Sequence, residues 1–149
     1  MLAVVRPHAW DLPLFLHVLG AMVLAGALAS VTVLAWAGAR RPERAVLSKA
    51  AFGTMLVLAV PSWLVMRLAA QWIYSKEGFS GKNDPNWLGV GFTVGDLGLP
   101  VLLLTTGFAF WWSRRPASAW QSRVVGVLAP LYLAALAFAW WVMTAKPGL

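Results

Sequence analysis

The sequence predicts an all-α membrane protein, a bundle of four transmembrane helices, and three observations support this prediction. Of the 149 residues, 60% are hydrophobic and 11% are charged, whereas soluble domains average about 45–50% and about 25%. The mean hydropathy is +0.73. Four long apolar segments follow one another, and each offers the roughly 20 helical residues that a bilayer core of about 30 Å requires.

The four expected spans form one domain over residues 1–149. They cover about 12–38, 50–74, 93–112 and 124–144, with two short loops and one long outer loop, 75–91. A proline lies inside each of the last three spans: Pro61, Pro100 and Pro130. Each proline removes a backbone donor, so a carbonyl one turn earlier must find another partner or the helix kinks.

The distribution of charge predicts the orientation. Seven of the twelve Lys and Arg residues lie in or beside the two short loops, against one acid, Glu43: Arg40, Arg41, Arg44, Lys49, Arg114, Arg115 and Arg123. Short basic loops stay in the cytoplasm, so both termini and the long loop are expected outside (N-out, C-out). The richness in Ala, Arg, Trp and Gly favours a bacterium with a GC-rich genome, and hence the bacterial cytoplasmic (inner) membrane.

Composition also excludes several functions. The chain has no Cys, which excludes disulfides, thiolate metal sites, iron–sulfur clusters and covalently attached haem. The net charge of +7 does not indicate nucleic acid, because the Arg residues flank apolar spans, where anionic lipid head groups supply the counter-charge. No nucleophile elbow, zinc-protease helix or phosphate-binding Gly loop is present. No enzymatic activity can therefore be assigned, and the expected partner is the lipid bilayer.

Three ionisable residues lie within the expected spans. His17 lies about six residues into the first span, Arg67 about seven before the outer end of the second, and Asp96 just inside the third. At about 1.5 Å per residue, all three come within the outer third of the membrane. Because ionised groups are costly in a bilayer, each one marks a candidate functional site.

The second span extends this candidate site. Trp63, Arg67, Gln71 and Tyr74 recur at helical spacing, so they form a polar and aromatic stripe on one face. Three interpretations stay open. Arg67 could extend to the interface while Asp96 caps the third span; the two could form an ion pair that only joins helices; or they could bind a small molecule, cofactor or ion.

The candidate ligand and partner are therefore open at this point. Haem b needs two axial ligands on facing helices. The candidate pairs are His17 with Met66, His17 with Met143, or His17 from two subunits. The other histidine, His8, precedes the first span. His17 is also the one candidate for an intramembrane metal ligand. We expect a ligand-binding protein or an accessory subunit of a membrane complex. The alternatives are a haem- or quinone-linked redox subunit and a small transporter or channel subunit.

Small residues predict where helices approach. Ala21, Ala25 and Ala29 are four residues apart, and Gly26 and Ser30 form a second such pair. Because helix contacts in lipid depend on close backbone approach, this row is expected to contact a neighbouring helix, or a second copy in a homo-oligomer.

Short motifs at both ends suggest a family. Leu16-His17-Val18-Leu19-Gly20-Ala21-Met22 resembles the opening of small four-helix bacterial membrane proteins of unknown function, which are distantly similar to the copper-resistance D (CopD-like) type and share its Leu-His-x-x-Gly motif. The closing Met143-Thr144-Ala145-Lys146-Pro147 is similar to the Lys-Pro ending of that group. Gln71-Trp72-Ile73-Tyr74, Asp84-Pro85-Asn86-Trp87, and the stretch from Gly91-Phe92 to Asp96 resemble one branch of it. The resemblance implies four helices and an outward histidine, and it implies no activity.

Overall fold

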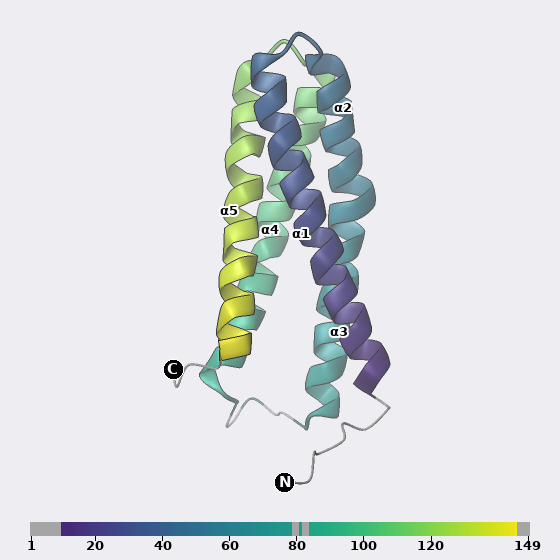
Figure 1. Ribbon diagram of the computed structural model, residues 1–149, viewed down its shortest axis with the longest axis vertical. Helices are drawn as coiled ribbons and strands as arrows, with labels where there is room; N and C mark the ends of the chain where they lie inside the picture. The colour runs from purple at the N-terminus through teal and green to yellow at the C-terminus, as the bar shows by residue number, and fades with distance from the viewer. Residues whose placement is uncertain (1–9, 79–80, 82–83, 146–149) are drawn as a thin grey trace.

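The computed structural model describes residues 10–78, 81 and 84–145, and the regular elements in this part of the chain are all helices. They are α1 (Asp11–Arg40), α2 (Arg44–Thr54), a π-helical turn (Met55–Ala59), α3 (Val60–Lys76), α4 (Asn86–Arg114) and α5 (Ala119–Ala145). The segment from α2 to α3 is one continuous helix, so four long helices lie side by side (Figure 1). All four are long and apolar enough to cross a membrane, which confirms the predicted all-α four-helix bundle.

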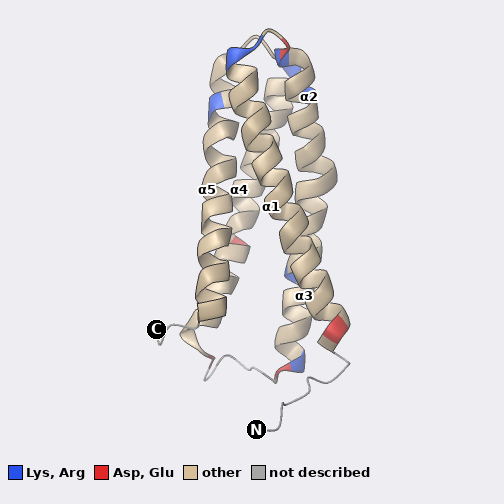
Figure 2. Cartoon of the chain, in the orientation of Figure 1, with Lys and Arg blue, Asp and Glu red and all other residues tan. Residues whose placement is uncertain are grey.

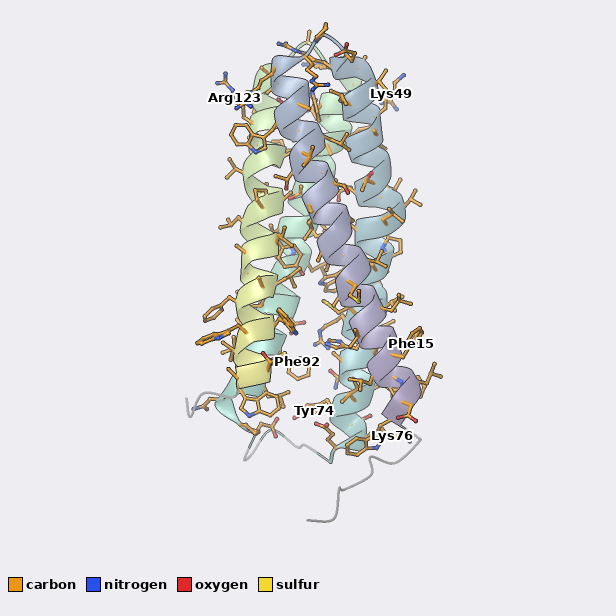
Figure 3. All side chains as sticks on the ribbon, in the orientation of Figure 1. Phe15, Lys49, Tyr74, Lys76, Phe92 and Arg123 are labelled. Atoms are coloured by element: carbon orange, nitrogen blue, oxygen red, sulfur yellow. The ribbon has the colours of Figure 1, made fainter. Side chains whose placement is uncertain are left out.

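Charge is distributed unevenly between the two ends of the bundle. The described chain begins and ends at the same end, and the two short loops lie at the other (Figure 1). Figure 2 shows that most of the Lys and Arg residues gather at the end with the short loops. Figure 3 labels two of them, Lys49 and Arg123, which point outward on opposite sides.

The outer loop is shorter than the sequence suggested. The expected loop covered 75–91, but α3 continues to Lys76 and α4 begins at Asn86. Pro85, with φ −63° and ψ 140°, is the extended residue from which α4 starts. The difference arises because a hydropathy pattern marks only the part of a helix that fits the hydrocarbon layer, and these helices extend past it.

In the seam between α1 and α3, the backbones of the two helices approach each other closely at Gly20. A Cβ atom on Gly20 would lie 2.7 Å from the Met66 nitrogen and 2.9 Å from the Ser62 oxygen. Further along α1, toward the short loops, buried residues recur at intervals of three and four on one face: Leu24, Leu28, Val31 and Ala35. Glycine at position 20 therefore sets the distance between the two helices.

The expected row of small residues does not form this seam. Ala29, Gly26 and Ser30 are exposed, while Ala21 packs at the edge of the core. A Cβ on Gly26 would meet nothing within 4 Å. The row therefore does not make the expected contact within the monomer, because α1 is apolar on every side and its sequence pattern does not identify the buried face. Contact with a second copy stays a prediction.

Two of the prolines have visible structural consequences. Directly before Pro61, the backbone widens into the π-helical turn, in which the Val60 N–H donates to the Met55 oxygen. The wide turn gives the proline ring room beside the preceding carbonyls. In α5, Pro130 cannot donate to the Gly126 carbonyl, and the Trp36 indole of α1 donates to that oxygen instead, at 3.0 Å. Here a hydrogen bond between helices replaces the backbone hydrogen bond that Pro130 cannot make.

Candidate functional site

The centre of the candidate site is an ion pair between α3 and α4. The Arg67 guanidinium meets the Asp96 carboxylate through the two nitrogens of one edge: Nε lies 2.5 Å from Oδ1 and Nη2 lies 3.3 Å from Oδ2. Its remaining nitrogen, Nη1, donates to Gln71 Oε1 at 3.1 Å. The Arg67 side chain is 23% exposed and the Asp96 side chain 55%. Such a two-point contact fixes the orientation of both groups.

Aromatic rings extend the site toward the end of the bundle where α1 begins and α5 ends. The Arg67 guanidinium lies over the Phe92 ring, 4.8 Å from its centroid, within the range of cation–π attraction. Phe92 of α4 meets Tyr74 of α3 edge to face at 5.3 Å, and Figure 3 shows both rings at the same end of the bundle. The Tyr74 hydroxyl donates to Asp84 Oδ2 at 2.6 Å. The contacts thus run without a break from Asp96 to Asp84.

A groove of about 420 Å³ opens beside these contacts. Its walls include two amides, a phenol, a carboxylate and two apolar side chains: Gln71, Asn86, Tyr74, Asp84, Leu88 and Phe92. The volume falls in the range of small-molecule sites, about 300–1,000 Å³. Its mixture of hydrogen-bonding groups and apolar walls suits a ligand that has one polar and one apolar part.

Trp63 forms the inner limit of the site. The residue is 7% exposed, and its indole Nε1 donates to the Gly95 carbonyl at 3.0 Å. Gly95 directly precedes Asp96 in α4, so this bond joins α3 to α4 next to the ion pair, on its side nearer the short loops. Trp63 therefore positions the two helices.

His17 takes part in a different contact. Its Nδ1 lies 2.9 Å from the Met66 carbonyl oxygen, and because a carbonyl only accepts, Nδ1 carries the proton. One turn along α1, Gly20 contacts the Met66 backbone. Within the described residues, the hydrogen bond of the His17 side chain joins α1 to α3 and so belongs to this α1–α3 seam. The Leu-His-x-x-Gly motif thus has a physical role, since its His and Gly together fasten α1 to α3.

The structure brings together five of the six predicted site residues and leaves one outside the network. The network includes four of them: Arg67, Asp96, Gln71 and Tyr74. Trp63 lies next to this network, where it bonds the residue before Asp96. His17 belongs to the α1–α3 seam instead. The shared depth that the sequence predicted is enough to pair Arg67 with Asp96, but depth along an axis does not specify which way a side chain points.

The described residues contain no group of three His, Asp or Glu side chains that could hold a metal ion. The two methionines considered as axial partners have other neighbours: Met66 is 6% exposed in the core, and the Met143 sulfur lies against Gly91. His8, Lys146 and Pro147 lie outside the described residues. Nδ1 donation to a carbonyl does leave Nε2 of His17 as the nitrogen able to act as a ligand.

Six of the eight groove residues were not identified from the sequence, and three of these six carry its further polar and aromatic groups: Asp84, Asn86 and Phe92. Phe92 had a detectable signal, because it lies four residues before Asp96 and so shares its face of α4. Asp84 and Asn86 belong to a stretch that the sequence assigned to the loop. No pattern in that loop indicates that Asp84 bonds Tyr74.

Comparison of the chain with protein-family models, curated proteins and solved structures finds no match. The fold and the contacts described above are therefore the basis for a functional proposal.

Proposed function

We propose that this protein binds a small amphiphilic molecule at the outer surface of a bacterial cytoplasmic membrane, alone or as an accessory subunit of a larger membrane complex. The ligand occupies the groove between α3 and α4 and meets Gln71 and Phe92, the two wall residues that contact Arg67. The observation that supports this most is the continuous network from Asp96 through Arg67 and Phe92 to Tyr74, because it lies beside an open groove.

The orientation rests on charge. Seven cations and one acid, Glu43, lie in or beside the short loops at one end of the bundle. Cytoplasmic loops are the ones enriched in Lys and Arg, so this end faces the cytoplasm. The opposite end, with the groove and both ends of the described chain, then faces outward.

The depth of the ion pair agrees with this orientation. From Lys49 to Arg67 and from Arg114 to Asp96 the separation is about 18 residues, or about 27 Å at about 1.5 Å per residue. Two helices thus place opposite charges almost one hydrocarbon thickness, about 30 Å, from the inner cations. The pair lies at the outer boundary of the hydrocarbon layer, where a ligand can enter from water or from lipid.

The groups in the groove define the ligand class. Gln71 accepts a hydrogen bond from Arg67, and within the described structure its amide nitrogen donates to no protein group. Asn86 offers a second amide, at the start of α4. Phe92 and Leu88 supply apolar surface. These groups fit a molecule with a hydrogen-bond-accepting head, such as a carbonyl or ester, and a hydrophobic body that lies against Phe92.

The experiment is native mass spectrometry of gently purified full-length protein, with organic extraction of whatever dissociates. Gly89 lines the groove, and a Cβ there would meet nothing within 4 Å, so Gly89→Phe has room for its first carbon and places its ring in the groove. We expect a co-purifying small molecule in the wild type and its loss in Gly89→Phe. Gly53→Phe is the matched control, because Gly53 is equally open but lies in α2.

Several outcomes separate this proposal from its alternatives. No bound molecule in the wild type, or one retained equally by Gly89→Phe, would contradict the binding proposal. A quinone that Gly89→Phe retains, or a Soret band in the purified protein, would support the redox alternative. Substrate-dependent flux in proteoliposomes that disappears in Arg67→Ala would support a transporter or channel subunit.

A further inference from the structure

A second groove lies on α4, on the side opposite its buried face. Its volume is about 570 Å³, and its walls are apolar: Pro100, Leu103, Leu104, Gly107 and Phe108. Pro100, Leu104, Gly107, Trp111 and Arg114 recur at intervals of four and three along α4, so they share one face. The groove exists because Gly107 has no side chain, and a Cβ there would meet nothing within 4 Å.

Aromatic rings and cations close the inner end of this groove. Trp111 of α4 meets Trp120 of α5 edge to face at 5.2 Å, and Phe108 meets Trp120 at 5.6 Å. Amphipathic indole rings favour the head-group layer. One turn beyond them, the Arg114 guanidinium lies 5.1 Å from the Phe110 centroid. Arg115 follows directly, and both arginines are exposed.

These arginines lack carboxylate partners. Among the described residues, the one ion pair joins Arg67 to Asp96, far from this end. Glu43 is the sole acid in or beside the two short loops, against seven cations. A ligand that reaches Arg114 and Arg115 therefore meets uncompensated positive charge.

We infer that this face of α4 is a binding site for one anionic phospholipid of the inner leaflet. An acyl chain lies in the groove from Pro100 to Phe108, the glycerol backbone lies at the level of Trp111 and Trp120, and the phosphate meets Arg114 and Arg115. The dimensions agree. From the level of Trp111 to Pro100 the distance is about 11 residues, or about 16–17 Å, and one leaflet of the hydrocarbon core is about 15 Å thick. An acyl chain that begins at Trp111 therefore reaches the far end of the groove near the middle of the bilayer.

The test uses native mass spectrometry of the full chain in detergent, titrated with phosphatidylglycerol or with phosphatidylcholine of identical acyl chains. The wild type should bind phosphatidylglycerol more tightly. Each Lys or Arg near a head group contributes about a fivefold factor, so the affinity of the double variant Arg114→Gln/Arg115→Gln for phosphatidylglycerol should fall roughly 25-fold. The control Arg40→Gln/Arg41→Gln removes the same charge at the end of α1 and should change the preference by less than about twofold.

A second pair of variants tests the acyl-chain half of the site independently. Gly107→Phe should reduce the binding of both lipids, while Gly53→Phe and Gly89→Phe should leave it unchanged; helical circular dichroism confirms folding in each case. Equal binding of the two lipids by the wild type would overturn the inference. So would equal losses in the two arginine variants, full binding by Gly107→Phe, or a dimer that Gly107→Phe abolishes, because a second copy would then cover the groove.

Discussion

The α1–α3 seam allows one prediction to be worked through in detail, the substitution Gly20→Ala. The added methyl would lie 2.7 Å from the Met66 nitrogen and 3.0 Å from its Cα. These are backbone atoms, which cannot rotate away as a side chain could. The two helices must therefore separate by about 0.7 Å to restore an ordinary contact of about 3.4 Å.

That separation also breaks a hydrogen bond. His17 Nδ1 lies 2.9 Å from the Met66 oxygen, and a shift of about 0.7 Å takes the two atoms to about 3.6 Å, beyond the range of a hydrogen bond. An interhelical hydrogen bond in a membrane protein contributes about 0.6 kcal/mol on average, and at most about 1.7. Overpacking adds about 1–3 kcal/mol. Gly20→Ala should thus lower the free energy of unfolding by about 2–4 kcal/mol.

Reversible unfolding in mixed micelles, followed by circular dichroism, measures this loss. Gly26→Ala is the matched control on the same helix, because its methyl would meet nothing within 4 Å, and it should be neutral or stabilising by up to about 1 kcal/mol. Adding His17→Leu should cost little in the Gly20→Ala background, where the bond is already broken. Equal stability of Gly20→Ala and Gly26→Ala, or an undiminished cost of His17→Leu, would refute the reasoning.

Three further predictions follow from contacts between helices and from charge. Swapping the charges of Arg67 and Asp96 should restore most of the roughly 1 kcal/mol that either single reversal costs, as a double-mutant cycle in detergent would measure; no recovery would mean that the pair contributes nothing to stability. Trp36→Phe should destabilise the protein by about 1–2 kcal/mol, but much less in a Pro130→Ala background, where the backbone donor returns; equal costs in both backgrounds would contradict this compensation. Because the chain has no Cys, Pro42→Cys gives a clean topology probe: an impermeant maleimide should label it only after the membrane is permeabilised, and labelling in intact cells would reverse the orientation.

Much of the fold could be predicted because the bilayer constrains it strongly. Length and hydropathy are sufficient to identify four spans, since only helices of about 20 apolar residues satisfy their backbone groups in lipid. The pairing of Arg67 with Asp96 was also accessible, because opposite charges at one depth in a low-dielectric medium attract strongly.

The remaining features could not be predicted because they depend on which face of each helix turns inward. The rotation of α1 about its own axis decides three of these features: the direction of His17, the exposure of Gly26 and the burial of Gly20. A soluble helix reveals its buried face by a polar opposite face. In lipid both faces are apolar, so α1 offers no such signal, and its rotation is decided by its packing against α3 and α5.

The π-helical turn at Met55–Ala59 sets how far α3 is rotated about the helix axis relative to α2. A π turn holds about one residue more than an α turn, so deleting one of its five residues would leave a plain α-helix with Arg67 still facing Asp96. Deleting Leu64, only one turn further along, would instead rotate everything beyond it by about 100° and carry Arg67 away from its partner. The span thus contains one short stretch whose length can change without turning Arg67 away from Asp96, and it lies just before Arg67 in the sequence.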